Sequence, residues 1–221
     1  QLFDVRGHRQ YKKWLQMVPE DRMFMVFKEE TLEELDISSY KQDVHIIDNE
    51  EKAKQISVSG KNIVLVDLPP SVEWLEMVIK GETPDRIYAF FYQKNTHFFS
   101  TMPTREHFKW YYAFLMKRKV FDLNKYGDEL AKHRGWSRET IDFMSKVFFE
   151  LKFVTMKNGF IQLNPTPGKR ELNESPAYQN KLVQYELENK LLYSSYEELK
   201  NWFERRIGSP VNNEEEVEIW I

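Results

Sequence analysis

The 221-residue chain has no cysteine, only eight glycines and no long apolar run, and each absence excludes a class of protein or site. Without cysteine the chain has no disulfide, no thiolate nucleophile and no cysteine-bound metal, which suits a reducing cytoplasm. No apolar stretch approaches the roughly 18 residues that a membrane-spanning helix needs. The first residues also lack the basic and apolar pattern of a secretory signal. We therefore expect a cytoplasmic protein that has no membrane partner.

The motifs of phosphate, metal and nucleophile sites are absent as well. Neither G-x-G-x-x-G nor G-x-x-x-x-G-K-[ST] occurs, so no nucleotide cofactor is expected. The five histidines show no H-E-x-x-H or other paired metal spacing, and no G-x-S-x-G sequence marks a nucleophile. Asp67 stands at the end of NIVLVDL, where nucleotide enzymes can place a ligand, but without a phosphate loop we interpret it as structural. We expect no catalytic residue, metal ligand or cofactor in this chain.

The charges are unevenly distributed, although the net charge is only −3. Residues 101–170 hold 14 Lys and Arg against 7 Asp and Glu, whereas the rest of the chain holds 18 against 28. A basic segment between two acidic ones indicates either a local surface for an anionic partner or charges that are spread over the surface and solvated. The chain starts with Gln1 rather than Met, and we interpret it as a piece of a longer protein.

Residues 1–100 alternate strand-like apolar runs with helix-like segments. The runs MFMVF and NIVLVDL are almost wholly apolar, which is typical of strands covered on both faces. Residues with good capping side chains, Asn49 and Ser71, precede two of the expected helices. Strands and helices that alternate in this way form a parallel sheet with helices on its faces. We predict an α/β domain, with a Rossmann-like, mostly parallel sheet, flanking helices and no phosphate loop.

Residues 101–164 predict three helices followed by a hairpin. Thr104 precedes the first helix, a second helix follows, and Ser137 precedes the third. The strands KFVTM and GFIQL are joined at Asn158-Gly159, the strongest short signal for a hairpin turn. This order predicts a winged-helix-like α+β domain. The apolar positions of its third helix face the core: Ile141, Phe143, Met144, Val147, Phe148 and Leu151.

The opposite face of the third helix is expected to carry Arg138, Asp142, Ser145 and Phe149. This set suits base recognition poorly, because DNA-reading helices contact base edges with Arg, Lys, Asn or Gln. An aromatic ring among mixed charges suits a protein contact or a stacking platform for single strands. Phe149 is therefore a candidate anchor for a partner protein, and burial under the C-terminal helices is the alternative. If the domain binds DNA, we expect it to hold the backbone through a set of basic residues: Lys117, Arg118, Lys119, Arg138, Lys152 and Lys157.

Residues 165–221 begin with a turn-rich connector, continue with two helices and end in an acidic tail. The second helix has the sequence of a capping box, since Glu198 stands three residues after Ser195. The last residues, NNEEEVEIWI, are acidic and then apolar, so an added strand, a loose tail and an interaction peptide all stay open.

Three long strings resemble the C-terminal domain of the RecJ exonucleases of Firmicutes. They are TMPTREHFKWYYAFLMKRKVFDL, YGDELAKHRGWSRETIDFMSKVFFELKFV and YSSYEELKNWF, and the resemblance is dense from Thr101 to Phe203. It implies a parent protein that degrades single-stranded DNA from 5′ to 3′. The nuclease core of that family is an Asp-His-His phosphoesterase with divalent metal ions, Mg²⁺ or Mn²⁺, followed by an oligonucleotide-binding fold. None of those metal-binding motifs occurs in this chain.

The resemblance implies an accessory domain of a nuclease of DNA repair and recombination, and two roles stay open. The domain could mediate contacts between the nuclease core and protein partners, because appended domains of related exonucleases contact single-strand-binding protein and other repair proteins. It could instead contact single-stranded DNA without sequence preference and guide it toward the nuclease core. A degenerate helicase-like domain that binds a nucleotide is a third interpretation, and the missing phosphate loop argues against it.

Overall fold

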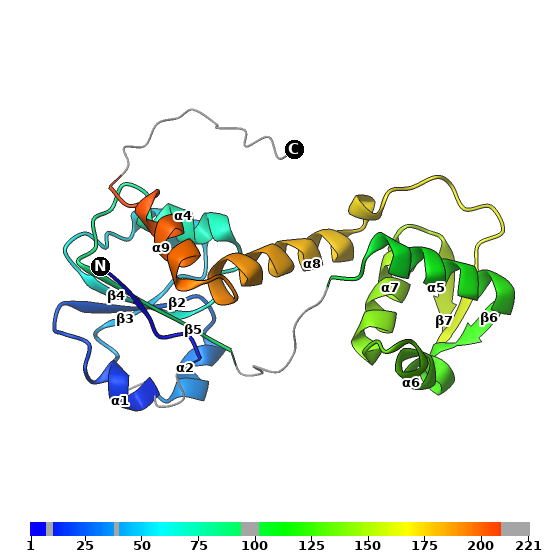
Figure 1. The fold of residues 1–221 in the computed structure, drawn as a ribbon, viewed down its shortest axis with the longest axis horizontal. Coiled ribbons are helices and arrows are strands. Elements are labelled where there is room, and N and C mark those ends of the chain that lie inside the picture. Colours follow the sequence, from blue (N-terminus) through cyan, green and yellow to red (C-terminus); the bar gives the residue numbers. More distant parts are fainter. Residues whose placement is uncertain (8–10, 38–39, 94–101, 209–221) are drawn as a thin grey trace. The chain divides into compact units, whose positions relative to one another are not determined.

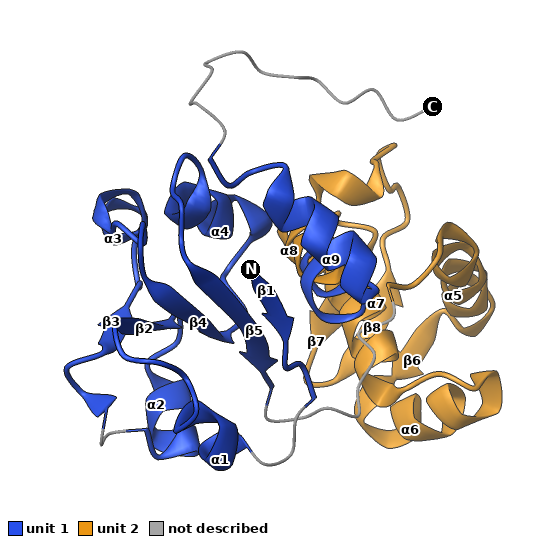
Figure 2. Cartoon of the chain, turned by 60° about the vertical axis from the view of Figure 1, so that its left-hand side comes forward, with its two compact units in different colours: residues 1–98, 186–221 blue, residues 99–185 orange. Residues whose placement is uncertain are grey.

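The chain divides into two compact units. The structure is a computed structural model that describes residues 1–7, 11–37, 40–93 and 102–208. Unit 1 consists of residues 1–98 and 186–221, and unit 2 of residues 99–185 (Figure 2). The boundary falls inside helix α8 (Pro176–Leu187). The sequence predicted three parts with boundaries after residues 100 and 164. Whether these parts fold independently is a different question from the division into compact units, so their boundaries stay a prediction.

Unit 1 is built on a parallel sheet of five strands in the order β1-β5-β4-β2-β3 (Figure 2). Each strand runs parallel to its neighbours. The predicted α/β sheet is therefore confirmed. The strands are β1 (Leu2–Asp4), β2 (Arg22–Val26), β3 (Val44–Ile46), β4 (Asn62–Asp67) and β5 (Arg86–Tyr92).

Helices cover both faces of this sheet (Figure 1). In β4, Ile63 and Leu65 pack with residues of α3, α4 and α9, whereas Val64 and Val66 pack with residues of α1 and α2. Because successive side chains of a strand point to opposite faces, a strand between two helix layers is apolar throughout. The helices are α1 (Tyr11–Leu15), α2 (Glu30–Leu35), α3 (Glu50–Gln55), α4 (Val72–Ile79), the π-helical turn η3 (Glu188–Leu192) and α9 (Tyr196–Glu204).

The π-helical turn η3 is bound by an arginine that follows β1. Arg6 Nη1 donates to the carbonyl oxygens of Leu191 at 3.0 Å and Leu192 at 3.2 Å. A π turn interrupts the regular i to i−4 bonding of a helix, so carbonyl groups near it need other donors. Arg6 also pairs with Asp4 at 2.6 Å. These bonds attach the segment before α9 to the edge of the sheet.

Unit 2 combines three long helices and most of α8 with an antiparallel sheet of three strands in the order β6-β8-β7. The predicted helices and hairpin are confirmed, whereas β6 was not predicted because its three residues are too few to show an alternating pattern. The elements are α5 (Arg105–Arg118), β6 (Val120–Asp122), α6 (Leu123–Arg134), α7 (Arg138–Glu150), β7 (Val154–Lys157), β8 (Phe160–Leu163) and the short helix η2 (Leu172–Glu174).

The hairpin between β7 and β8 turns at Asn158 and Gly159, as predicted. Both residues have positive φ, 52° and 84° respectively. A two-residue turn of type I′ needs this conformation at both positions, which Asn-Gly adopts readily. A Cβ atom on Gly159 would also collide with the side chain of Asn124.

The apolar face of α7 lies in the core, as predicted, but one expected outward residue does too. Ile141 and Met144 are fully buried, and Phe143 packs against them partly buried. The helical pattern places Ser145 on the outward face, and this prediction is wrong because its side chain is fully buried. Its Oγ donates to the Ile141 carbonyl oxygen at 2.7 Å and lies 2.7 Å from the hydroxyl of Tyr111. A hydroxyl whose bonds are all satisfied inside can join a core.

The predicted capping box of α9 is present. Ser195 Oγ accepts from the Glu198 backbone at 3.2 Å, and the Glu198 carboxylate accepts from the Ser195 backbone at 2.7 Å. The acidic and apolar tail at 212–221 lies outside the described residues. Within the part of the chain that is described, none of the helices combines the length and apolar character of a membrane span.

Candidate nucleic-acid interface

Five of the six basic residues predicted to contact DNA lie exposed at the ends of elements in unit 2. Lys117 and Arg118 end α5, and Lys119 is the residue that caps it. Lys152 follows α7, and Lys157 ends β7. None of the five forms an ion pair with an acidic residue in the described part of the chain, so their charges are available to an anion.

The sixth residue, Arg138, is already held by two acidic residues. Its Nε lies 2.9 Å from Asp142, and its Nη1 lies 3.4 Å from Asp128. Gly127 makes room for this guanidinium, since a Cβ atom there would lie 2.7 Å from Arg138 Cζ. The hydrogen bond to Asp142 raises the pKa of Arg138. Arg138 therefore links α6 to α7, and its charge is balanced within the unit.

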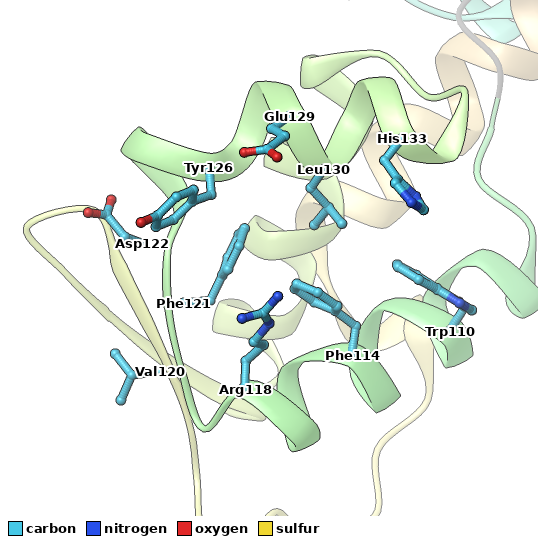
Figure 3. A pocket seen from close by; sticks show the side chains of 10 residues that line it. All are labelled: Trp110, Phe114, Arg118, Val120, Phe121, Asp122, Tyr126, Glu129, Leu130 and His133. Atoms are coloured by element: carbon cyan, nitrogen blue, oxygen red, sulfur yellow. The ribbon is translucent and has the colours of Figure 1, made fainter.

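A groove of about 550 Å³ lies between α5, β6 and α6 (Figure 3). Trp110, Phe114 and Arg118 line it from α5, where residues four apart share one face of the helix. Tyr126 and Leu130 line it from α6, together with residues of β6. We call this the aromatic groove and define it by six residues: Trp110, Phe114, Arg118, Phe121, Tyr126 and Leu130.

Aromatic rings form much of the groove's surface. Trp110 and Phe114 stack with 5.6 Å between ring centroids, and Phe114 meets Phe121 edge to face at 5.2 Å. Phe121 is buried, whereas Tyr126 is 43% exposed. The groove therefore combines exposed ring surface with rings that the core of unit 2 holds in place.

Two arginines lie against these rings. Arg134 Cζ lies 4.0 Å from the centroid of the Trp110 ring, and Arg118 Cζ lies 5.7 Å from that of Phe114. Figure 3 shows the Arg118 side chain beside the ring of Phe114, on the groove side of α5. A guanidinium that lies on a ring still presents N–H donors at its edge, which suit a phosphate or carboxylate.

Two acidic residues, Asp122 and Glu129, also line the groove. Nearby positive groups offset the charge of Asp122 more than that of Glu129. Asp122 Oδ1 accepts from the Lys125 backbone at 3.0 Å as the N-cap of α6, next to the positive end of the helix dipole. Lys125 Nζ lies 5.0 Å from the centroid of the Tyr126 ring and adds a positive charge at this end of the groove. The hydrogen bond with Tyr126 raises the pKa of Lys125. Glu129 lines the α6 wall and forms no ion pair within the described residues. An anionic ligand would therefore be repelled mainly by Glu129.

The groove is formed by a helix cap, a helix end and a strand pairing that follow one another closely in the chain. Thr104 and His107 form a capping box that fixes the start of α5. The helix ends at Lys119, which has a φ of 62° and a ψ of −50° and turns the chain into β6. Residue Phe121 of β6 then pairs with Ile161 of β8. The three elements that line the groove are thus consecutive in the chain.

Phe149, the predicted anchor for a partner protein, is 51% exposed on α7. It follows directly after Phe148, which is buried in the core of unit 2. An exposed aromatic ring on a helix that is itself well packed is typical of a protein contact. Its role as an anchor stays a prediction.

Asp67 lies at the carboxyl end of the parallel sheet, where ligands bind in many open α/β sheets. Its carboxylate is hydrogen-bonded to groups of the protein itself. Its carboxylate accepts from the backbones of Phe27 at 2.8 Å and Lys28 at 2.9 Å, and from the Thr31 hydroxyl at 2.8 Å. Burial raises the pKa of Asp67, and these three bonds oppose that shift. The carboxylate thus occupies the donors of the β2–α2 turn that a phosphate would otherwise use.

No group of three or more acidic or histidine residues in the described ranges could hold a metal ion. His107 belongs to the α5 capping box, since the Thr104 backbone donates to its Nδ1 at 3.2 Å. His45 lies on the edge strand β3, where burial lowers its pKa. His8 and His97 lie outside the described residues.

The aromatic groove was not predicted from the sequence. Its signal was present, because Trp110, Phe114 and Arg118 recur every four residues. The same spacing is typical of a helix that faces a core, and a pattern alone does not distinguish the two. The groove depends on β6, whose short sequence gave no strand signal.

Residues 1–203 match the sequence model of a family described as the C-terminal domain of single-strand DNA-specific exonuclease. A curated relative, the single-stranded-DNA-specific exonuclease RecJ of Bacillus subtilis, is 46% identical over 206 residues, or 93% of this chain. The match covers 26% of that relative, so this chain spans about a quarter of its length. No solved structure matches this chain.

Proposed function

Because the chain belongs to the family of C-terminal domains of single-strand DNA-specific exonucleases, we propose that it is an accessory, non-catalytic part of a RecJ-like exonuclease. In this proposal the 5′-to-3′ degradation of single-stranded DNA occurs in a nuclease core of the same protein. Divalent Mg²⁺ or Mn²⁺ would be bound in that core, and the protein would serve DNA repair and recombination in the cytoplasm. The extent of the match within the much longer RecJ relative supports this arrangement.

The finer fold assignments belong to the same proposal. Unit 1 would be a Rossmann-like layer that serves as a scaffold without a phosphate loop. Unit 2 would be winged-helix-like, with α5, α6 and α7 as its three helices and the β7–β8 hairpin as its wing. The element order supports both assignments.

The accessory role that the geometry supports best is contact with single-stranded DNA, without sequence preference, to guide it toward the nuclease core. The observation that carries this proposal is the cluster of Lys117, Arg118 and Lys119, three successive exposed cations beside the aromatic groove. Such a cluster binds phosphates regardless of sequence. Lys152 and Lys157 would add to it, and Arg138 would contribute little because its charge is balanced by Asp128 and Asp142.

This function is tested by titrating a labelled oligothymidine strand with the 221-residue chain at two salt concentrations. We expect the double variant Lys117→Ala/Lys119→Ala to weaken binding and to flatten the dependence of log Kd on log salt by about 0.7 per lost phosphate contact. The matched control is Lys13→Ala/Lys80→Ala, which removes two exposed lysines from unit 1. Equal salt slopes for the two double variants would contradict the proposal.

A second candidate role is a protein contact that couples the nuclease to repair partners, among them single-strand-binding protein. The half-exposed Phe149 favours it, because buried interface anchors are commonly aromatic. Replacing Phe149 by Ala should weaken binding to immobilised single-strand-binding protein and leave the melting temperature and DNA affinity unchanged. Phe160→Ala, a similarly exposed aromatic on β8, is the control. Equal effects of both substitutions would remove the case for Phe149.

A further inference from the structure

We propose that the aromatic groove is a binding site for the unpaired bases of single-stranded DNA, in which a base stacks on Tyr126 while Arg118, which lies on the Phe114 ring, bonds the adjoining phosphate. This inference rests on the proposed contact with single-stranded DNA and adds to it a site and a physical basis for preferring single strands. Bases in a duplex are stacked and paired, so they cannot enter such a groove.

The size and surface of the groove suit a base. Its volume of about 550 Å³ falls within the roughly 300–1,000 Å³ of pockets that take small organic ligands. Tyr126 is 43% exposed and is held against Phe121, whose ring centroid lies 6.5 Å away. Lys125 Nζ lies 5.0 Å from the centroid of the Tyr126 ring. A ring that its neighbours hold in place loses little entropy when a base stacks on its exposed surface.

Arg118 places a positive charge where a phosphate next to a stacked base would lie. Its guanidinium is 5.7 Å from the Phe114 ring and points into the groove (Figure 3). Lys117 and Lys119 are its neighbours in the chain, so a strand leaving the groove would meet further cations. Aromatic rings flanked by cations are the pattern by which proteins hold single strands without reading their sequence.

A second groove of unit 2, of about 330 Å³, fits this ligand less well. Its rim carries Lys109 and Arg170, which already pair with Glu106 at 2.6 Å and Glu174 at 2.8 Å. The rings of Phe108 and Phe148 in its lining are almost wholly buried and leave no face for a base. Its lining also includes Arg105 and the partly exposed rings of Tyr112 and Phe153, but none of its rings is as exposed as that of Tyr126. The larger volume and the exposed ring of Tyr126 therefore favour the aromatic groove.

The test compares three labelled ligands of equal length: an oligothymidine strand, the same strand with abasic sites in place of the bases, and a duplex. The 221-residue chain should bind oligothymidine more tightly than the other two. Tyr126→Ala should weaken oligothymidine binding roughly 5- to 150-fold, the range expected for one lost stacking aromatic, and leave binding of the abasic strand unchanged. Tyr126→Phe, which keeps the ring, should restore the affinity for oligothymidine.

The controls separate stacking from folding and from simple charge. Phe160→Ala removes an aromatic side chain that is 47% exposed outside the groove, and it should bind all three ligands like the parent chain. Melting temperatures of all variants exclude unfolding as the cause of lost binding. Glu129→Gln should tighten binding of both single strands, because it removes a negative charge from the groove wall.

Each outcome decides between the two proposals. If the parent chain binds the abasic and oligothymidine strands equally, or if Tyr126→Ala binds oligothymidine normally, base stacking in the groove is refuted while backbone contact stands. If the parent chain binds no single strand even at low salt, the proposed function fails and this inference fails with it. An unchanged affinity of Glu129→Gln would place the strand outside the groove.

Discussion

At the scale of the residue, burial raises the pKa values of two polar groups, Asp67 and Tyr111, with different consequences. Asp67 is a carboxylate in an apolar sheet, and its burial opposes ionisation although three donors surround it. Tyr111 is a buried hydroxyl, and burial raises its pKa to about 12. Tyr111 therefore stays neutral at any physiological pH. The Asp67 carboxyl, in contrast, ionises at a higher pH in the folded chain than in the unfolded chain.

The shift of Asp67 predicts a stability that falls as pH rises. In the unfolded chain the carboxyl ionises near its ordinary value of 3.8, and in the folded chain above it. Between these two pKa values the folded state binds more protons than the unfolded state, so the free energy of unfolding decreases with rising pH. Between the two pKa values, we expect the free energy of unfolding of the parent chain to fall relative to that of Asp67→Asn. Above the folded-state pKa, the difference between the two free energies should be constant. Urea unfolding at a series of pH values measures the difference, and a rise across the window would mean that the three hydrogen bonds outweigh burial.

The Tyr111–Ser145 pair predicts a large effect from removing one oxygen atom. Since Ser145 Oγ donates to Ile141, the Tyr111 hydroxyl donates to Ser145. Ser145→Ala leaves that hydroxyl buried without a partner and should reduce the free energy of unfolding by about 1–3 kcal/mol. The double variant Ser145→Ala/Tyr111→Phe should recover part of the loss, because it removes the stranded donor as well. Additive losses in a double-mutant cycle would show that the two groups are not coupled.

At the scale of the element, the end of α5 is strained at a residue that is also a proposed DNA contact. Lys119 has a φ of 62°, a region that L-residues other than glycine rarely adopt. Glycine, which has no Cβ atom, adopts backbone conformations with positive φ at little steric cost. A lysine that remains here despite the strain is consistent with a role for its charge.

This strain predicts that stability and DNA affinity change in opposite directions in one variant. Lys119→Gly should raise the free energy of unfolding by roughly 1 kcal/mol, because glycine adopts this backbone conformation without a clash. The same change should weaken binding of oligothymidine. Lys119→Ala loses the charge but keeps the strain, so it should bind as weakly as the glycine variant without gaining stability. Thermal melting and the salt titration check both effects, and a destabilised glycine variant would contradict the account of strain.

Long, patterned elements were predictable from the sequence. The strand NIVLVDL and the helices that follow Thr104 and Ser137 have strong apolar patterns or caps, and the structure confirms them. The prediction that Ser145 faces outward was wrong. A sequence pattern does not distinguish a serine on the surface from one whose hydrogen bonds are satisfied inside the core. The aromatic groove could not be predicted, since it requires knowing that β6 pairs with β8.

At the scale of the whole molecule, unit 1 depends on a segment that is distant in sequence. Leu187 and Leu191 at one end of this segment, and Leu199 and Phe203 in α9, are buried in the same cluster as Leu65 of β4. Each such side chain contributes roughly 1.5–3 kcal/mol when it is fully buried. Together they approach the roughly 5–15 kcal/mol that separates a folded domain from its unfolded state.

We therefore expect that deleting residues 186–221 unfolds unit 1. The truncated chain should lose cooperative unfolding of its parallel sheet, whereas the signals of unit 2 should persist, because the core of unit 2 lies within residues 99–185. Hydrogen exchange followed by mass spectrometry distinguishes the two units peptide by peptide. A truncation at 209, which keeps α9, is the matched control and should protect both units. Normal protection of β4 and β5 in the shorter chain would contradict the prediction.

The split of unit 1 over both ends of the chain also has a consequence for biosynthesis. A ribosome that adds about 5–20 residues per second needs on the order of ten seconds to proceed from β5 to α9. Unit 2 is made entirely within that interval and can fold while the sheet of unit 1 still lacks one of its covering helices. The nascent chain thus carries apolar side chains such as Leu65 and Ala89 without their final cover until α9 emerges. Unit 1, whose synthesis begins first, therefore finishes folding after unit 2.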